Sequence, residues 1–453
     1  MMAGKKEIKL VPTEEQPYEI PENWCWTTIG TLANVKGGKR LPKGKVLIDS
    51  KTEHPYIRVT DFKDQSVNLP KVKYIDEDTF SEIKNYIISS RDIYVSIAGS
   101  IGKVGIIPDE LDGANLTENA AKITNIRCVN QKYLLYALMT EMAQEQMSNA
   151  TVSTTQAKLA LCRIETVCIP LAPTAEQERI VTAITNLFAD LDKAAENAQT
   201  IIDGYEVRKN TILYQAFNGD LTEEWRKANG VSEQWDDCVL LDVLKDKPRN
   251  GYSPQPVNYP TKYKSMTLSA TTSGTFAPEH FKFIDEEIPE SSHLWMVPGD
   301  ILIQRANSLE KVGTSAIYTG GYHEFIYPDL MMKLQVKDGV SAEFIAYQLK
   351  TQTVLTYFRS NATGTAGNMP KINQQVVSSA PMRIPTLAEQ QEIVRILDEL
   401  LGNEQRIKEA AEEMLDKIAM MKKSILADTF RGKLGTNDPA DEPATELLRQ
   451  ILA

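Results

Sequence analysis

The chain has few of the residues from which metal and redox centres are built. Its 453 residues include four histidines and five cysteines, and none of the histidines has a second His or Cys at metal-ligand spacing. An odd number of cysteines without a C-x-x-C motif is typical of reduced thiols in a cytoplasmic protein. No apolar run approaches the roughly 18 residues that a membrane span needs. The N-terminus also lacks the apolar stretch of a secretory signal, so we expect no membrane partner.

Catalytic motifs are missing as well. The chain contains neither G-x-G-x-x-G nor G-x-x-x-x-G-K-[ST], the glycine-rich loops that bind nucleotide phosphates. It has no Pro-Pro dipeptide, which excludes the Asn/Asp-Pro-Pro-aromatic motif of adenine amino-methyltransferases. Pro108-Asp109 and Pro328-Asp329 could open a nuclease motif, but no Asp/Glu-x-Lys follows either one within its domain. We therefore expect no catalytic residue, no cofactor and no metal ion in this chain.

The net charge of −11 argues, taken alone, against nucleic acid as a partner. The acidic excess is uneven, however. Residues 21–173 carry 18 basic against 17 acidic side chains, whereas residues 174–226 carry 5 against 10. Residues 233–385 and 386–437 each have a net charge of −2. An anion-binding surface would therefore be a local patch on 21–173 or 233–385.

The sequence repeats itself with a shift of 208 to 213 residues. AEQERIV at Ala175–Val181 recurs as AEQQEIV at Ala388–Val394, and from these points to Leu221 and Leu434 the copies share 15 of 47 positions. DIYVSIAGSIGKVG at 92–105 matches DILIQRANSLEKVG at 300–313 in seven places, and SNAT occurs in both copies. A period this long is not that of a solenoid and indicates a duplicated unit, made of one domain and one long segment.

The two long segments have the pattern of paired helices. Apolar residues alternate at spacings of four and three from Ile180 to Ile212 and from Ile393 to Ile425, without a proline, as in a coiled-coil seam. Antiparallel pairing would place the two charged seam residues against each other, in a partly buried ion pair that fixes the register. The alternative is that each helix packs only on its own domain. The seam residues singled out are Ile180, Ile184, Leu187, Leu191 and Arg208 in the first helix, and Ile393, Leu397, Leu400 and Glu404 in the second.

The two domains are predicted to be α+β. Short apolar or alternating runs, punctuated by Gly, Pro, Asn and Asp, predict strands and loops in 24–173 and 235–385. Shorter helical stretches follow at Gln131–Met147 and Ser341–Phe358. The chain is thus divided into an N-terminal extension (1–20), a first domain (21–173), a central long helix (174–226), a second domain (233–385), a C-terminal long helix (386–437) and a tail (438–453).

Basic and polar loops recur in both copies. VKGGKRLPKGK, for example, places five cations among three glycines, which allow backbone to approach a phosphate. For any one loop a solvated surface is the more ordinary interpretation, and the recurrence of such loops is what favours DNA. The candidate DNA-binding residues are Lys36, Lys39, Arg40, Lys43, Lys45, Arg58, Lys63, Ser100, Lys103, Gln156 and Lys158 in the first copy, and Lys262, Lys264, Arg305, Asn307, Lys311, Asn368 and Lys371 in the second.

This layout resembles the specificity subunit of type I restriction–modification systems. The long helices open with IPLAPTAEQERIV and IPTLAEQQEIV and close with AFNGDL and TFRGKL, and the N-terminal element IPENWCW and the tail DEPATELLRQIL also look like those of the family. The likeness covers essentially the whole chain. The helix motifs are its specific part, since the two domains match the family only in outline.

The resemblance implies a non-catalytic DNA reader. Two tandem α/β target-recognition domains, related by a pseudo-two-fold duplication, would each read half of a bipartite site in double-stranded DNA. Two long antiparallel coiled-coil helices would separate them and dock two methyltransferase subunits. S-adenosylmethionine would then belong to those subunits, and ATP and Mg to restriction subunits. Two other classes stay open at this point: a coiled-coil scaffold with protein-binding end domains, and a self-sufficient modification enzyme, which the missing cofactor motifs oppose.

Overall fold

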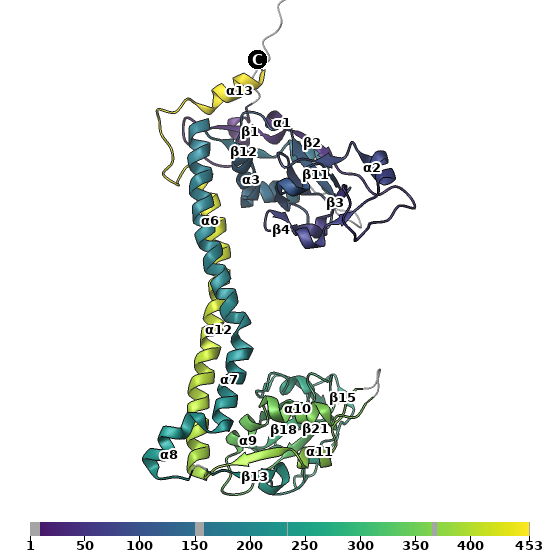
Figure 1. Cartoon of the computed structure of the whole chain (residues 1–453), viewed down its shortest axis with the longest axis vertical. Coiled ribbons are helices and arrows are strands. Elements are labelled where there is room, and N and C mark those ends of the chain that lie inside the picture. Colours follow the sequence, from purple (N-terminus) through teal and green to yellow (C-terminus); the bar gives the residue numbers. More distant parts are fainter. Residues whose placement is uncertain (1–9, 150–157, 233, 365–368, 453) are drawn as a thin grey trace, which may run out of the picture. The chain divides into compact units, whose positions relative to one another are not determined.

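The structure is a computed structural model that describes residues 10–149, 158–232, 234–364 and 369–452 (Figure 1). The chain divides into two compact units. Unit 1 comprises residues 1–197 and 414–453, and unit 2 comprises residues 198–413. Each unit contains one of the two predicted domains together with a part of both long helices.

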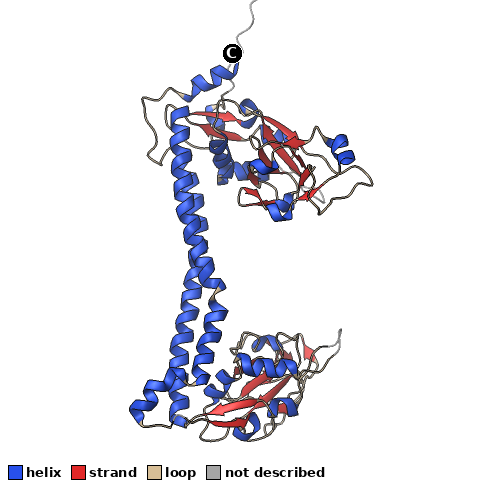
Figure 2. Cartoon of the chain, viewed as in Figure 1, coloured by secondary structure: helices blue, strands red, loops and turns tan. Residues whose placement is uncertain are grey.

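The domain of unit 1 contains two four-stranded sheets with short helices around them (Figure 2). The first sheet is antiparallel, with the order β2-β11-β8-β9, and consists of Asn34–Gly37, Ala120–Thr124, Ile93–Ser96 and Val104–Gly105. The second has the order β6-β3-β10-β7 and consists of Lys73–Tyr74, Pro55–Ile57, Ala114–Leu116 and Ile87–Ile88, with β3 and β10 parallel. Two further pairs are β1 (Cys25–Thr28) with β12 (Cys168–Leu171), and β4 (Phe62–Lys63) with β5 (Ser66–Val67). The helices are α1 (Ile29–Leu32), α2 (Glu77–Ile83), α3 (Gln131–Met139), α4 (Glu141–Asn149) and α5 (Leu161–Glu165).

The domain of unit 2 repeats the first sheet and three strands of the second, whose fourth strand joins the opposite edge. Its first sheet has the order β14-β21-β18-β19 and consists of Arg249–Asn250, Met331–Leu334, Ile301–Gln304 and Ser315–Ile317. Its second has the order β15-β17-β16-β20 and consists of Pro256–Val257, Phe281–Ile284, Tyr263–Met266 and Phe325–Ile326, with β16 and β20 parallel. β13 (Asp236–Val239) pairs with β22 (Pro381–Ile384), and the helices are α9 (Ala342–Gln348), α10 (Gln352–Ser360) and α11 (Gln374–Ser378). The duplication in the sequence is therefore a duplication of the fold.

The repeated D-I motif starts the buried strand of each domain. All four residues of β8 and of β18 are buried, as expected for a strand covered on both faces. The aspartate before each strand, Asp92 or Asp300, lies 3.4 Å from a lysine Nζ on the neighbouring strand, that of Lys122 or Lys333. A charged side chain that is buried in this way needs an opposite charge beside it. Desolvation lowers the pKa of Lys333, and the charge of Asp300 opposes that shift.

The long helices end at or near Gly219 and Gly432, the two glycines that the sequence offers as helix ends. The segment expected as one helix over 174–226 forms α6 (Thr174–Asp203) and α7 (Tyr205–Asn218), followed by a 3-10 turn at Asp220–Thr222 and the short α8 (Glu223–Asn229). Gly219 ends α7 in the left-handed conformation, with φ of +90°, which is the usual way for a glycine to stop a helix. The helix expected over 386–437 is α12 (Leu387–Thr429), and α13 (Ala444–Leu452) lies in the tail.

In both units the two helices run antiparallel. In unit 2, Arg208 Nε lies 2.7 Å from Glu404 Oε2, and a later residue, Thr222, bonds to the earlier Glu389. In unit 1, Lys422 donates to the carboxylate of Asp192. The predicted pairing of Arg208 with Glu404 is confirmed, and the pair is partly buried, with 37% and 17% of the two side chains exposed.

The alternative, that each helix packs only on its own domain, is wrong, although the ends of the helices do pack on the domains. Ile180, Ile184 and Phe188 of α6 belong to the core of the unit 1 domain, and Leu426 and Phe430 from the end of α12 complete that core. The core of unit 2 combines its domain in the same way with residues at the end of α7 and the start of α12, namely Leu213, Ala216, Phe217, Ile393 and Leu397. Each helix end therefore has contacts both with a domain and with the other helix.

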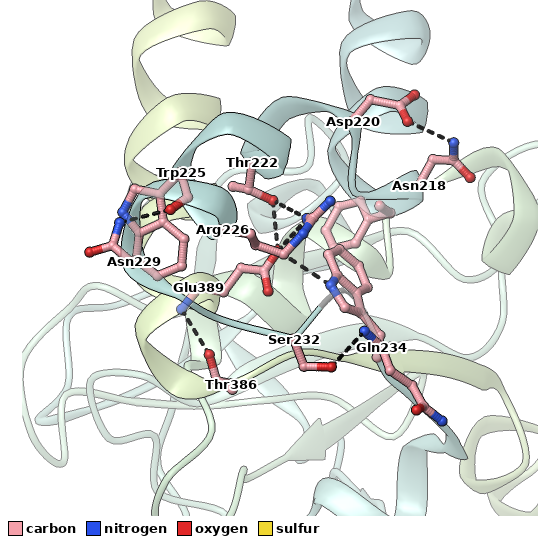
Figure 3. A network of polar contacts seen from close by, with 12 residues as sticks. Asn218, Asp220, Thr222, Trp225, Arg226, Asn229, Ser232, Gln234, Thr386 and Glu389 are labelled. Atoms are coloured by element: carbon pink, nitrogen blue, oxygen red, sulfur yellow. Dashed lines mark hydrogen bonds and ion pairs between the residues drawn. The ribbon is translucent and has the colours of Figure 1, made fainter.

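A buried glutamate fixes the start of α12 to its domain. Glu389 accepts hydrogen bonds from Thr222 Oγ1 at 2.7 Å, Arg226 Nη1 at 2.6 Å and Trp235 Nε1 at 3.3 Å. Figure 3 shows Thr222 and Arg226 converging on this carboxylate, whose side chain is 1% exposed. A cation and two neutral donors thus replace the water that Oε1 loses on burial, while Oε2 is buried without a partner among the described residues.

Unit 1 has the same arrangement with different partners. Glu176, at the start of α6, accepts from Trp24 Nε1 at 2.7 Å, Asn437 Nδ2 at 3.0 Å and Thr436 Oγ1 at 3.1 Å. Within the described residues, the hydrogen bonds to this carboxylate all come from neutral side chains. The Trp and Glu of both repeats therefore attach a domain to the first turn of its following helix.

The glutamine of the A-E-Q motif makes a second attachment. Gln177 Oε1 accepts a hydrogen bond from the backbone N–H of Asn130, the N-cap of α3, at 2.8 Å. Gln390 Oε1 accepts one from the backbone N–H of Ser341, the N-cap of α9, at 2.9 Å. The motif is thus a structural joint that holds each domain in a fixed position on its helix.

Candidate nucleic-acid interface

The glycine-rich loop of unit 1 lies next to two other predicted segments. Gly37, Gly38 and Lys158 line a hollow of about 430 Å³ together with Glu118. A Cβ atom at Gly38 would lie 2.1 Å from a carbonyl oxygen of the 116–117 backbone, so this approach requires glycine. Arg40 is exposed and donates to Glu118 Oε1 at 2.6 Å. Glu118 is therefore the ion-pair partner of Arg40 and also lines the hollow that Lys158 lines.

The other cations of this loop differ in their surroundings. Lys36 is exposed on β2, and Lys43 is exposed in the loop. Lys39 Nζ lies 5.5 Å from the centre of the Tyr86 ring, as in a cation–π contact. Lys45 Nζ lies 3.8 Å from Asp76 Oδ1 and 3.9 Å from Asp78 Oδ2, so acidic side chains partly balance its charge.

Arg58 has a structural role, which the sequence did not indicate. Its guanidinium donates to both carboxylate oxygens of Asp61, at 2.7 and 3.0 Å, and to the carbonyl of Lys71 at 3.0 Å. Asp61 is fully buried. Because this carboxylate needs its cation, Arg58 has little freedom to leave it for a phosphate.

Lys63, Ser100 and Lys103 form a second group in unit 1. Lys63 is exposed on β4, near the turn of the β4–β5 hairpin, and Ser100 and Lys103 are exposed in the turn between β8 and β9. The backbone N–H of Ile106 donates to the carbonyl of Gln65 at 3.0 Å, so the hairpin lies beside this turn. Lys63 Nζ is 3.8 Å from Asp64 Oδ2.

One feature of the interface is the same in both units. Lys158 forms an isolated β-bridge with Ala98, and Lys371 forms one with Ala306. The two alanines occupy the same position in the repeated D-I motif. Each lysine is exposed and lies directly against the loop that follows the buried strand. Gln156 and Asn368, the candidates just before these lysines, lie outside the described residues.

In unit 2, the loop after β18 contains or contacts three of the candidate DNA-binding residues. The backbone N–H of Asn307 donates to the carbonyl of Pro370 at 3.3 Å, and Ile372 N–H donates to the carbonyl of Arg305 at 2.8 Å. Arg305, Asn307 and Lys371 are therefore neighbours, and Lys311 is exposed in the turn that follows. The side-chain amide of Asn307 already donates to Gln304 Oε1 at 2.6 Å.

Lys262 and Lys264 belong to the other sheet of unit 2. Lys264 is on β16, and its Nζ lies 5.0 and 5.2 Å from the ring centres of Phe281 and Phe325 and 3.7 Å from Glu324 Oε1. Lys262 precedes this strand and lies 5.2 Å from the ring centre of Tyr263. Both cations thus contact aromatic rings, and within the described residues no hydrogen bond or ion pair joins their side chains to the group around Arg305.

The part of the chain that the structure describes has no group of three His, Cys, Asp or Glu side chains placed to hold a metal ion. In that same part, no helix combines the length and the apolar character required to cross a membrane.

The sequence did not predict the two buried Asp–Lys pairs. In each repeat the lysine of the pair follows the D-I motif, on a later strand of the same sheet. In a single sequence, however, such a lysine cannot be told from a lysine on the surface.

A sequence profile described as the type I restriction modification DNA specificity domain matches residues 21–200 and 235–413. The matches follow the two repeats and cover more than half of the chain. The chain belongs to this specificity-domain family. The recurring fold, the A-E-Q joints and the paired lysine loops are therefore features of a specificity-domain protein.

Two distant relatives match along nearly their whole length. The chain is 21% identical over 434 residues to the type I restriction enzyme EcoKI specificity subunit of Escherichia coli K12, covering 94% of this chain and 92% of the relative. It is 20% identical to the StySPI specificity subunit of Salmonella potsdam over the same shares.

Two solved structures of the family share the fold. A chain from a type I R-M system, solved for its complex assembly and conformational transition, superimposes with a TM-score of 0.71 at 17% identity, over 92% of this chain and 100% of that one. The HsdS subunit from Thermoanaerobacter tengcongensis gives a TM-score of 0.59 at 18% identity, over 93% and 100%.

The seam of this specificity-domain protein has a buried and an exposed half. Ile180, Ile184, Ile393 and Leu397 are fully buried, and Leu191 and Leu400 are half-buried. Leu187 is 39% exposed, because its neighbour Phe188 takes the buried position instead. Further seam residues with 38% to 51% of their surface exposed are Ile201, Ile407, Met414 and Met421. Two helices alone cannot cover so wide an apolar stripe.

Proposed function

We propose that this chain is the specificity subunit of a type I restriction–modification complex, and that each of its domains reads one half of a bipartite site in double-stranded DNA. The observation that carries the proposal is the lysine loop in each unit. Lys158 and Lys371 pair with equivalent loops, and Arg305, whose side chain can contact phosphates and base edges, lies beside Lys371. The proposed role is recognition, with catalysis left to other subunits.

The two loops carry different side chains, which predicts two different half-sites. Ile97 and Gly99 in unit 1 correspond to Arg305 and Asn307 in unit 2. Arginine and asparagine side chains read guanine and adenine edges, whereas isoleucine and glycine offer no polar side-chain atom. We expect the half-sites to be read in inverted sense and separated by unread bases, with centres about one helical turn apart.

The expected partners are two methyltransferase subunits and the restriction subunits. The exposed half of the seam, such as Leu187, Met414 and Met421 in unit 1, supports docking of a further helix there. S-adenosylmethionine would be bound by the methyltransferase subunits, and ATP and Mg by the restriction subunits. Such a complex would work in the cytoplasm, where it meets DNA.

A methylation map of cells with and without the gene tests this function. The proposal expects one bipartite adenine-methylation motif that disappears with the gene. Lys158→Ala and Lys371→Ala should each weaken DNA binding by the methyltransferase complex, and each should lower the slope of log affinity against log salt by about 1. Lys227→Ala, at an exposed lysine paired with Glu223 and Glu224, is the matched control and should change neither. An unchanged methylation map would overturn the proposal.

A further inference from the structure

Unit 2 contains a hollow that lies outside the predicted DNA-reading surface. It has a volume of about 810 Å³ and is formed by α7, α10, α12 and two loops. Three cations line it, namely Lys209, Lys350 and Arg359. Five serine and threonine side chains also line it, those of Thr272, Ser273, Thr275, Thr314 and Ser315.

Two of these cations have no carboxylate partner within the described residues. Lys350 makes no ion pair there, and its Nζ lies 5.2 Å from the ring centre of Tyr347. Arg359 Nη2 donates to the backbone carbonyl of Glu310 at 2.8 Å, and its buried Nε has no hydrogen-bond partner. A cation held away from water without an opposite charge is unfavourable, so this arrangement favours an anion.

The acidic groups of the hollow are already engaged. Lys209 Nζ lies 3.8 Å from Glu206 Oε2. Asp398 Oδ1 accepts a hydrogen bond from the Tyr347 hydroxyl at 2.5 Å. Burial, and after it the charge of Lys209, lower the pKa of Lys350 to about 8, and the charge of Asp398 opposes the shift. An anion near Lys350 would favour its charged form and raise this pKa.

A buried hydroxyl gives independent support. Ser315, on β19, is 1% exposed, and its Oγ atom has no hydrogen-bond partner among the residues that the structure describes. Buried hydroxyls nearly always have a partner, and one without a partner in the wall of a hollow calls for a ligand. A phosphate oxygen would accept its proton.

The corresponding hollow of unit 1 does not have this character. Thr140 in unit 1 and Thr351 in unit 2 each accept a hydrogen bond from the backbone N–H three residues later, so the two threonines are equivalent. The residue before each is then also equivalent, which places Met139 at the position of Lys350. Met139 lines a hollow of about 610 Å³ with Glu141, Glu145 and Lys423. The cationic lining is therefore not a requirement of the shared fold.

We propose that the hollow of unit 2 is a binding site for a phosphate group, held by Lys350, Arg359 and the hydroxyl of Ser315. Arginine, lysine and hydroxyl donors together are the usual ligands of phosphate esters. The volume suits a ligand of nucleotide size. A backbone phosphate of DNA has the same chemistry, so the source of the phosphate is decided by experiment. The site does not depend on which bases the two domains read.

Isothermal titration calorimetry of the full chain tests the site, with pyrophosphate, AMP and adenosine as ligands. Pyrophosphate and AMP should bind, and adenosine, which lacks the phosphate, should not. Lys350→Met, which introduces the residue found in unit 1, should weaken pyrophosphate binding at least 10-fold, and Lys423→Met in unit 1 should leave it unchanged. Ser315→Ala should weaken binding a few-fold without lowering the melting temperature, because its hydroxyl has no partner to lose. If Lys350→Met does not fold, Ser315→Ala still tests the site.

The pH dependence provides a further check. Lys350 loses its proton between pH 7 and 9, so pyrophosphate affinity should fall several-fold over that range in the wild type but not in Lys350→Met. Tyr205 and Tyr347 have raised pKa values and stay neutral there. Displacement of pyrophosphate by a DNA duplex would identify DNA as the source of the phosphate, and its absence would identify a small molecule. Equal binding of AMP and adenosine, or wild-type affinity in both Lys350→Met and Ser315→Ala, would overturn the site.

Discussion

Individual buried charges determine where this chain is most sensitive to substitution. Arg226→Met would leave the Glu389 carboxylate buried without its cation, and we expect this to destabilise unit 2 by about 3–5 kcal/mol. Lys227→Met, at the next residue of α8, removes an exposed pair and should leave the melting temperature nearly unchanged. Thermal melts of the two variants measure the difference. Equal melting temperatures would show that the Glu389 cluster does not need its arginine.

Lys350 illustrates a conflict between stability and binding at one residue. Its pKa is about 8 in the folded chain, below the ordinary value for lysine. The unfolded chain therefore binds this proton more tightly, and stability rises as the pH increases from about 8 towards the ordinary lysine pKa. In phosphate-free buffer at pH 7, Lys350→Met should stabilise unit 2 by on the order of 1–3 kcal/mol. This gain should shrink in melts recorded near pH 10, and a loss of stability at pH 7 would contradict it.

At the scale of elements, two glycines of unit 2 should respond in opposite directions to the same substitution. Gly219 ends α7 with φ of +90°, so Gly219→Ala should cost about 1–2 kcal/mol. Gly402 lies inside α12, where an added Cβ meets nothing within 4 Å. Gly402→Ala should therefore stabilise the helix by about 0.5–1 kcal/mol. Melting temperatures that shift in the same direction would refute this description of the helix ends.

The ion pair between α7 and α12 is expected to set the register more than the stability. Glu404→Arg alone would oppose Arg208 with a like charge, and Arg208→Glu with Glu404→Arg would restore an opposite pair. A double-mutant cycle should give a coupling energy of about 1 kcal/mol, because both side chains are partly exposed. A coupling of zero would mean that the pair contributes nothing to helix pairing.

For the whole molecule, the features predictable from the sequence were the periodic ones. The 213-residue shift identified the duplication, and the four-three alternation identified the helices and the Arg208–Glu404 pair. Features that need contacts between distant residues were not predictable. Arg226 lies 163 residues from Glu389 in the sequence, and no sequence pattern around either residue predicts that they pair. Gly219 was predictable as the end of α7, whereas the turn and α8 that follow it, which contact Glu389 through Thr222 and Arg226, were not.

The paired helices are also expected to set the spacing of the half-sites. Seven residues inserted near Ala198 and seven near Met414 keep both seams in phase, because seven residues are one coiled-coil repeat. They add about 10 Å of helix, or up to about three base pairs at 3.4 Å each. A methylation map of the variant should show a longer spacer between unchanged half-sites. An active variant with the original spacer would show that other subunits set the gap.

The most direct measurement is a methylation map of a chain that carries the first domain twice. Residues 235–385 are replaced by residues 24–173, so that both positions hold the same reader while both helices stay intact. If each domain reads one half-site, the methylated motif must become an inverted repeat of the first half-site, and the second half-site must vanish. Retention of the original two-part motif, or a motif unrelated to either half, would contradict independent reading by the two domains.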